Sequence, residues 1–233
     1  MSTENQLKLE FGATMEINLK NEFVLSELEY FREKFYELLQ PSDEFVRQTS
    51  IGYDYKPDII RYQCSEERLE EIIKEDGDRP FPYDVNASPL RAFTYDGVKK
   101  KEWEKLDHKI RFQLVKQLGV SSTALSNRYP RGGLTGWHTN SNSAGYQFLF
   151  TWSETGEGAF RYKDVETGKI ITLQDKPGWQ ARQYHFSDQP SELLWHCCYT
   201  DCERITIALK IDHTEHAITK EFRDDFIFEL ETQ

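Results

Sequence analysis

Apolar residues recur at helical spacing in three segments of the first half of the chain. The segment 24–39 (VLSELEYFREKFYELL) ends before Pro41, and the segment 66–75 (EERLEEIIKE) ends at a turn signal, Asp76-Gly77. The segment 99–118 has the longest run of this periodicity. An apolar residue every three to four positions gives a helix one face to bury. The pattern therefore predicts three helices, whereas the Pro-, Asn- and Asp-rich stretch 79–89 predicts a loop.

The pattern changes after residue 120. Short runs rich in Thr, Tyr, Phe, Trp and Ile alternate there with Gly, Asn and Asp, which is typical of strands joined by turns. Eight short strands of this kind predict a sandwich or jelly roll. Helices first and strands later predict an α+β layout, in which helices pack on one face of a sheet. The predicted strands are 124–129, 134–138, 146–152, 159–162, 170–173, 180–186, 192–198 and 204–211.

The length of the chain, 233 residues, suits one domain with a sizeable apolar core. Aromatic residues make up 14% of the chain, and disordered chains are poor in aromatics. We therefore expect a single folded domain over residues 1–233. Within it we expect a mostly helical N-terminal layer (1–120), a β core (121–213) and a C-terminal extension (214–233).

Charge narrows the set of partners. The formal net charge is −11, from 40 acidic and 29 basic side chains. An acidic chain repels phosphate backbones, so nucleic acid is disfavoured as a partner. No run approaches the roughly 18 apolar residues of a membrane helix, and the N-terminal segment 1–12 is polar, unlike a signal peptide. We therefore expect a cytoplasmic protein with no membrane partner, and the sequence carries no signal for an oligomeric state.

Four cysteines are present, Cys64, Cys197, Cys198 and Cys202. In a long cytoplasmic chain, free thiols are more common than a disulfide framework. Three of the four lie close together, which raises the alternative of a zinc site, but the paired C-x-x-C spacing is absent. Buried thiols that pack as small apolar side chains are the favoured interpretation.

Two histidines and one arginine lie in sequence contexts that suit a shared binding or catalytic site. His138 ends a short predicted strand after a Gly-rich turn, and His196 lies within an apolar predicted strand. Arg204 follows eight positions later and opens the strand RITIALKI. A guanidinium on so apolar a strand needs a partner if it points inwards, and a carboxylate is the natural one. Taken singly, such residues are more often core histidines or ion-pair partners, but their joint spacing favours a shared site.

The segment from about 126 to 211 resembles the iron(II)/2-oxoglutarate-dependent oxygenases. The pattern of that family is H-x-D/E, then some fifty-odd residues, then H, then R-x-S or R-x-T on the next strand. Here the pattern reads His138-Thr139-Asn140, then His196 58 positions later, then Arg204-Ile205-Thr206. Looser matches are EGAFRY (157–162), Pro-Gly (177–178) before YHF (184–186), and NRY (127–129). Each motif alone is weak, and the ordered set is more specific.

The resemblance implies a double-stranded β-helix, a cupin-like jelly roll, behind an N-terminal helical layer. It implies an Fe(2+) ion and 2-oxoglutarate as co-substrate, with hydroxylation of a substrate and release of succinate and CO2. The substrate would be a small molecule or a protein side chain. By position in the motifs, the metal ligands would be His138, His196 and Asn140. The 2-oxoglutarate site would be formed by Arg204, Thr206, Tyr129 and Asn127.

Asn140 departs from the pattern, because the family normally has Asp or Glu there. An amide oxygen is neutral and is a weaker ligand for a hard divalent ion. Asn140 could ligate nonetheless, or it could leave the position to water, chloride or a substrate group. A carboxylate from elsewhere could replace it, or the site could be degenerate. The carboxylates considered for that replacement are Glu154, Glu157 and Asp201.

These alternatives leave three functions open. The first is a hydroxylase, the second is a halogenase or other oxidase on the same scaffold, and the third is a non-catalytic β-barrel binding protein. Two further arginines, Arg161 and Arg182, lie on predicted strands near the site. They could receive an acidic substrate, but we expect them to form surface ion pairs.

Overall fold

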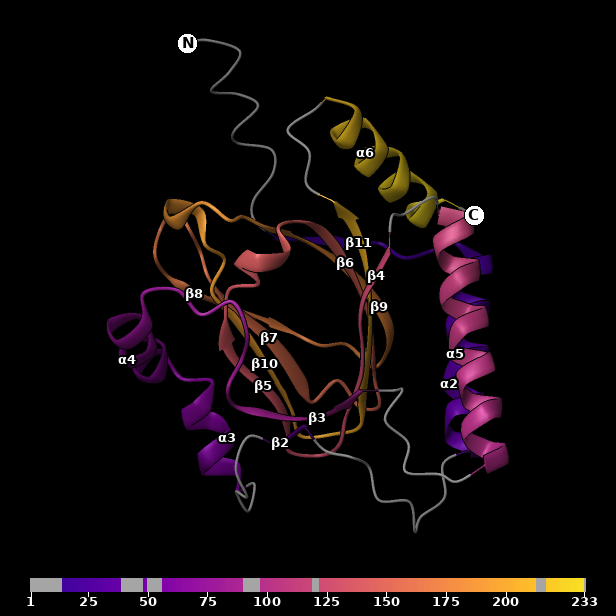
Figure 1. Cartoon of the computed structure of the whole chain (residues 1–233), viewed down its shortest axis with the longest axis horizontal. Helices are drawn as coiled ribbons and strands as arrows, with labels where there is room; N and C mark the ends of the chain where they lie inside the picture. Colours follow the sequence, from indigo (N-terminus) through magenta and orange to yellow (C-terminus); the bar gives the residue numbers. More distant parts are fainter. Residues whose placement is uncertain are drawn as a thin grey trace.

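The strands form one ladder that folds over itself into two facing sheets (Figure 1). The computed structural model describes residues 14–38, 48–49, 56–89, 97–118, 122–212 and 217–232. The strand order is β1-β9-β6-β11-β4-β3-β5-β10-β7-β8, and β2 pairs with β3. The bounds are β1 Thr14–Ile17, β2 Gln48–Thr49, β3 Val85–Pro89, β4 Ser122–Tyr129, β5 Gly133–His138, β6 Gly145–Ser153, β7 Gly158–Lys163, β8 Ile170–Gln174, β9 Gly178–Phe186, β10 His196–Thr200 and β11 Arg204–Asp212.

The order of these strands identifies the fold. Consecutive strands from β4 to β7 alternate between the sheets, β8 stays beside β7, and β9 to β11 alternate again. One sheet therefore has the order β9-β6-β11-β4 and the other β5-β10-β7-β8, with antiparallel pairing throughout. This double Greek-key arrangement is a double-stranded β-helix, the jelly-roll variant expected from the sequence.

Strand β11 is buried on both of its faces, although only one of them is apolar. Ile205, Ile207 and Leu209 belong to the core cluster beneath the helices, whereas Arg204 and Thr206 line a cavity between the sheets. Side chains alternate between the two faces of a strand, so both faces of β11 are buried. The strand therefore positions polar groups inside the barrel while its other face anchors the helical layer.

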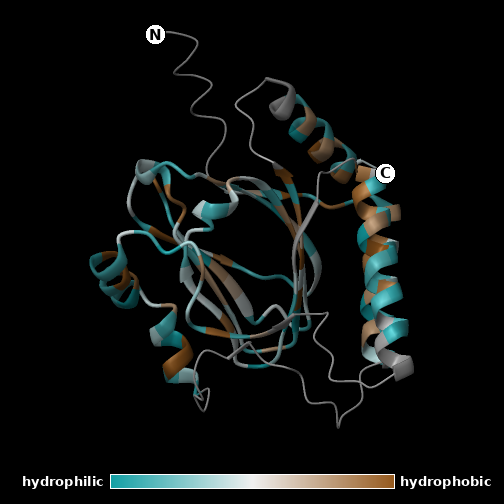
Figure 2. Ribbon diagram, viewed as in Figure 1, coloured by the Kyte–Doolittle hydropathy of each residue, from teal (hydrophilic) through white to brown (hydrophobic). Residues whose placement is uncertain are grey.

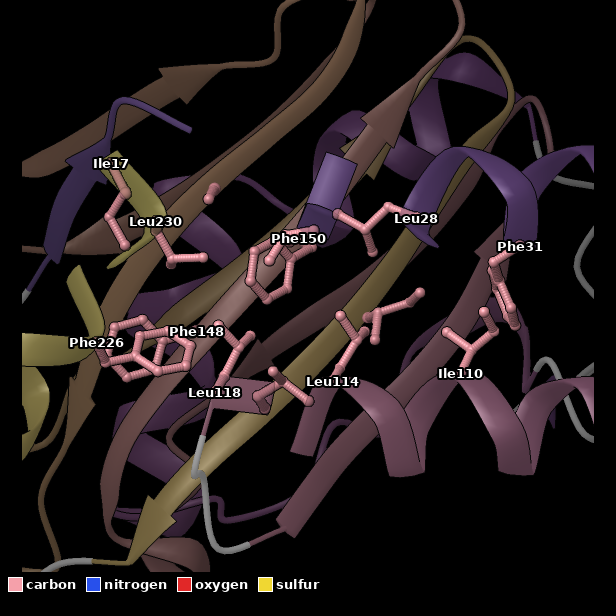
Figure 3. Close-up of a cluster of buried hydrophobic side chains, with 14 of the residues drawn as sticks. Ile17, Leu28, Phe31, Ile110, Leu114, Leu118, Phe148, Phe150, Phe226 and Leu230 are labelled. Carbon is pink, nitrogen blue, oxygen red and sulfur yellow. The ribbon is translucent and has the colours of Figure 1, made fainter. Parts of the chain in front are cut away.

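Helices cover both sheets. Figure 3 shows side chains of α2, α5 and α6 packed against Phe148 and Phe150 of β6. On the opposite sheet, Leu134 and Trp137 of β5 pack with side chains of α3 and α4. In Figure 2 the helices carry both hydrophilic and hydrophobic residues, as expected of helices that cover a sheet. Their bounds are α2 Glu22–Leu38, α3 Pro57–Gln63, α4 Glu66–Asp76, α5 Gly97–Leu118 and α6 Ala217–Glu231. None of these helices is long and apolar enough to cross a membrane.

Several predicted elements need correction. The helical layer is split between the two sheets and does not lie on one face only. The predicted loop 79–89 contains β3, which pairs with both β4 and β5 and joins the sheets. The strand predicted at 192–198 begins only at His196. The C-terminal extension, for which no secondary structure was predicted, contains the helix α6. The four cysteines are buried free thiols, as expected.

Candidate metal centre and anion anchor

A cavity between the two sheets brings most of the sequence-predicted site residues together. Six of the seven line it, and Asn127 is the exception. Both sheets contribute, so residues far apart in the sequence face one enclosed space. The lining residues are Tyr129, Thr135, His138, Asn140, Gln147, Leu149, Phe160, Phe186, His196, Cys197, Cys198, Arg204, Thr206 and Ala208.

The two histidines are direct neighbours at one end of this cavity. His138 and His196 face each other across the β5–β10 pair, and their ring centroids are 4.0 Å apart. Nδ1 of His138 lies 2.9 Å from the Gly136 carbonyl oxygen, and Nδ1 of His196 lies 2.9 Å from the Leu194 carbonyl oxygen. A carbonyl only accepts, so both Nδ1 atoms carry the proton. Each Nε2 therefore keeps a lone pair, which is what a metal ion requires.

Burial keeps both rings neutral. It lowers the pKa of His138 to about 4, although the carbonyl of Gly136 opposes this. It lowers the pKa of His196 as well, and the neighbouring His138 adds to that effect. Since protons compete with metal ions for Nε2, neutral rings are prepared for ligation at neutral pH.

The depressed pKa values make stability depend on pH. An unfolded histidine takes up a proton below a pKa of about 6.5, whereas folded His138 does so only near 4. The free energy of unfolding is therefore highest above pH 6.5 as far as His138 is concerned. It falls as the pH drops towards 4, by about 3 kcal/mol for His138 alone. Urea unfolding in chelator at a series of pH values measures this slope. A His138→Gln/His196→Gln variant should flatten it, and an unchanged slope would contradict the assignment.

Asn140 lies beside His196. Its Nδ2 is 3.3 Å from Nε2 of His196, and a half-turn of the amide brings Oδ1 to the same place. Its backbone is left-handed, with φ at 57°, a conformation that Asn and Asp tolerate better than other residues with a side chain. Asn140 therefore lies next to the His196 imidazole, whose ring is itself 4.0 Å from that of His138, at a place from which a third ligand would act.

No carboxylate replaces Asn140 among the residues that the structure describes. Glu154, Glu157 and Asp201 do not line the cavity, and no Cys, Asp or Glu joins the two histidines to form a group of three. The alternative in which one of these carboxylates replaces Asn140 therefore finds no support among the described residues. The side chains at this candidate metal site are therefore all neutral: two imidazoles and one amide.

The segment before β3 fixes the loop that carries His138 and Asn140. The amides of Gly136, Thr139 and Asn140 donate to the carbonyls of Asp84 (2.6 Å), Arg79 (2.9 Å) and Pro80 (3.1 Å). A Cβ atom on residue 136 would lie 2.9 Å from Cβ of Asp84, so glycine permits this approach. The loop that carries the histidine is thus held by backbone hydrogen bonds as well as by its strand.

Arg204 also lines the cavity, where its Nη1 lies 3.9 Å from Sγ of Cys198. It is 2% exposed, its Nη1 donates to Oγ1 of Thr206 (2.8 Å), and its guanidinium lies 5.2 Å from the ring centre of Tyr129. Its Nε donates to Asp175 (2.8 Å). Burial opposes the charge of Arg204, but the attraction of Asp175 is among the effects that leave its pKa raised. A permanently charged guanidinium inside the cavity has N–H donors that can bind an anion.

Tyr129 and Asn127 support this part of the site differently. Tyr129 accepts a hydrogen bond from Thr135 (3.2 Å), and burial raises the pKa of its hydroxyl, so it is a neutral wall of the cavity. Asn127 is 7% exposed and pairs with Thr206 across the β4–β11 ladder. Its side chain interacts with Tyr129 and does not line the cavity.

Sequence reasoning missed Asp175 and misplaced Arg182. Asp175 lies in the turn between β8 and β9, where Asp usually reads as a turn residue, yet its side chain is fully buried. Arg182 is 3% exposed and pairs with Asp175, so the expected surface ion pair is wrong for it. Gln147 and Cys198 also line the cavity. The alternation of β6 and β10 could have placed them there, once one inward residue was known on each strand.

Comparison with known proteins gives structural likenesses only. No protein-family model matches the chain, and no curated protein matches its sequence. Solved structures that it resembles include a prolyl-4-hydroxylase from Pseudomonas putida, at 10% identity and a TM-score of 0.42, covering 88% of this chain and 96% of that one. A dioxygenase for auxin oxidation from Arabidopsis thaliana, in complex with 2-oxoglutarate, has 12% identity and a TM-score of 0.38, covering 88% and 85%. An oxidoreductase of the 2OG-Fe(II) oxygenase family from Burkholderia pseudomallei has 10% identity and a TM-score of 0.33, covering 77% and 89%. The fold assignment rests on the strand order of the chain itself.

Proposed function

We propose that this protein is an Fe(II)- and 2-oxoglutarate-dependent oxygenase that hydroxylates a small molecule or a protein side chain. One observation carries the proposal: two buried histidines with unprotonated Nε2 atoms and a buried arginine–threonine pair line the same cavity. A metal ion held by nitrogen at one end and an anion held by a guanidinium at the other are what a chelating keto diacid requires. The four buried free thiols support a cytoplasmic location.

The donor set fits a divalent iron ion. His138 and His196 would ligate through Nε2, and Asn140 would contribute Oδ1 after a half-turn of its amide. Iron held there would supply redox chemistry between dioxygen and the keto acid. The reaction balances as one oxygen atom inserted into a C–H bond and the other incorporated into succinate, with loss of CO2.

The residues of the chain hold and shield the co-substrate. Arg204 would bind the distal carboxylate through its fork of N–H donors, and the Thr206 hydroxyl would complete that contact. Phe160 and Phe186 pack on the His196 ring, with centroids 5.4 Å and 4.8 Å away, and fix its orientation. Together with Leu149 they give the cavity apolar walls that exclude water from the metal side.

An anaerobic titration tests the proposal. Fe(II) and 2-oxoglutarate added together to the full chain should produce a visible metal-to-ligand charge-transfer band, which neither produces alone. Admission of dioxygen should then release succinate. Absence of any band at saturating Fe(II) and keto acid would leave the third function, a non-catalytic binding protein with a degenerate metal site.

The neutral third position favours one alternative strongly enough to test beside the first. Since no carboxylate joins the two histidines among the described residues, an anion such as chloride could complete the metal site, as a halogenase or other oxidase requires. If chloride shifts the charge-transfer band and chlorinated product is detected by mass, the protein is a halogenase. If chloride changes neither, hydroxylation stands.

Replacement of Asn140 by Asp should tighten Fe(II) binding, by about tenfold or more, because a carboxylate adds a negative charge and a harder oxygen ligand. The left-handed backbone at this position accepts Asp as well as Asn. Competition with a coloured chelator measures the affinity. Asn142→Asp is the matched control, since it adds the same charge on the exposed side of the same loop. Equal effects of both variants would show that residue 140 does not face the metal.

A further inference from the structure

One buried carboxylate joins two buried arginines, of which Arg204 lines the cavity and Arg182 lies outside its lining. Oδ2 of Asp175 accepts from Nε of Arg204 at 2.8 Å, and its Oδ1 accepts from Nη1 of Arg182 at 3.1 Å. The Asp175 side chain is 0% exposed, and the two arginine side chains are 2% and 4% exposed. Three charges so far from water are held only where their partners are fixed.

The protein makes room for this carboxylate. The amide of Asp175 donates to the carbonyl of Gly158 (2.8 Å), which begins β7. A Cβ atom on residue 158 would lie 2.6 Å from Oδ2 of Asp175, so any other residue would displace the carboxylate. Arg182 is fixed in turn, because its Nη2 donates to the Gln174 carbonyl (2.7 Å) and to the Gln180 side chain (3.1 Å). The position of Asp175 is therefore set by backbone and by strands on both sheets.

This contact decides how Arg204 can hold a ligand. A guanidinium binds a carboxylate either sideways, through Nε and one Nη, or end-on, through both Nη atoms. Asp175 occupies Nε, Nη1 donates to Oγ1 of Thr206 (2.8 Å), and the Tyr129 ring lies against the guanidinium. Nη1 also makes a long contact with Sγ of Cys198 (3.9 Å), a weak acceptor that a carboxylate would replace. Among the described residues, none accepts a hydrogen bond from Nη2 of Arg204. The end-on edge is consequently the one presented to the cavity, at a fixed distance from the histidines.

The charges also balance for one carboxylate. Taken alone, the three buried groups (two guanidinium groups and one carboxylate) carry a single net positive charge, and a fourth group, the exposed carboxylate of Glu16, lies 3.6 Å from Nη2 of Arg182 on the solvent side. A keto diacid whose first carboxylate and keto oxygen bind the metal presents one further negative charge. Asp175 thus neutralises one of the two neighbouring guanidinium charges. The remaining positive charge on Arg204 is still there to attract the ligand.

We propose that Asp175 is a positioning residue that locks Arg204 end-on and thereby selects the chain length of the keto diacid. The inference rests on the proposed function, because it assumes that one end of the diacid chelates a metal at His138 and His196. With both ends fixed, an acid that is one methylene longer or shorter places its distal carboxylate away from the Nη edge. Release of Nε lets the guanidinium swing, so that longer and shorter acids are accepted.

Equilibrium binding separates this role from a purely structural one. The dissociation constants of 2-oxoglutarate, the longer 2-oxoadipate and the shorter oxaloacetate are measured by calorimetry on the full chain with Fe(II) and without dioxygen. The main variant is the double replacement Asp175→Leu/Arg182→Gln, which removes the acceptor of Nε together with one charge of each sign and so keeps the net charge of the native cavity. The native protein should prefer 2-oxoglutarate by about tenfold or more over both other acids.

The selectivity ratios decide the outcome. In the double variant, we expect the preference for 2-oxoglutarate to fall about tenfold, towards equal binding of the three acids. An unchanged preference in a folded double variant would overturn the inference and leave Asp175 a structural residue. If the native protein binds none of the three acids, the proposed function fails, and the inference fails with it.

A second replacement keeps the test decisive if the double variant does not fold. Asp175→Glu keeps both charges but reaches one methylene further, so it should push the Arg204 guanidinium towards the histidines. The preference should then shift from 2-oxoglutarate to the shorter oxaloacetate. Arg182→Gln alone keeps the Asp175–Arg204 contact and should keep the native preference while weakening all three acids. A Glu variant with the native preference would also overturn the inference.

Discussion

Alanine at His138 or at His196 is expected to abolish the charge-transfer band and to weaken Fe(II) binding at least about 100-fold. Each histidine would supply one of only two nitrogen ligands, and the third position offers no charge to compensate. Loss of a residue that merely orients a ligand costs 10–100-fold in affinity in known metal sites, so loss of the ligand itself costs more. Chelator competition measures the affinity, and visible absorbance measures the band.

The control for these variants is His108→Ala. His108 lies on the exposed face of α5 and stacks on Phe112, whose ring centre is 6.2 Å away, far from the cavity lining. It should change neither the affinity nor the band. Far-UV circular dichroism checks that each alanine variant is folded. Folded variants of His138 and His196 that keep the native band would refute the metal assignment.

The sequence predicted the elements whose pattern is local. The predicted helix at α4 and the predicted strand at β11 agree with the structure to within a residue at each end. Glu66–Asp76 repeats at helical spacing, and Arg204–Asp212 carries Ile or Leu at every second position. The sequence of α6 also has a helical pattern, since Phe222, Phe226 and Leu230 recur every four residues, but the sequence analysis does not predict this helix.

Other elements depend on contacts that no local pattern contains. β3 lies in a segment whose Pro and Asn read as a loop, and its strand pairing comes from β4 and β5 on either side. The apolar run before His196 was read as strand, but Leu194 and Trp195 pack in the core from irregular backbone. Tertiary packing, and not periodicity, decides both cases.

The residues of the site also fall into those that the sequence predicts and those that only the tertiary structure shows. The motif spacing was enough to place His138, His196 and Arg204 in one cavity. It could not supply Asp175, because the two arginines that bind it lie on β9 and β11, with β6 between them. The partner that Arg204 was expected to need is thus partly the protein's own carboxylate, and the remaining Nη edge is what a ligand would use.

Replacement of Arg204 by Met should weaken 2-oxoglutarate binding by about 30-fold or more, because the distal carboxylate would enter a cavity without its charge partner. Removal of one member of a buried, hydrogen-bonded charge pair costs about 2–5 kcal/mol. Met fills much of the same volume, and Asp175 keeps Arg182 as a partner, so the carboxylate is not left alone. Calorimetry with Fe(II) in the absence of dioxygen measures the dissociation constant.

A matched ligand shows whether the loss arises at the distal carboxylate. 2-Oxobutyrate chelates a metal through the same carboxylate and keto oxygen but has no second carboxylate. Its affinity should therefore be nearly the same in the native protein and in Arg204→Met. The affinity of Arg204→Lys for 2-oxoglutarate should lie between that of the native protein and that of Arg204→Met, since a lysine keeps the charge but lacks the two parallel N–H donors of the guanidinium. Equal losses for both keto acids would mean that Arg204 supports the cavity as a whole and does not bind the carboxylate.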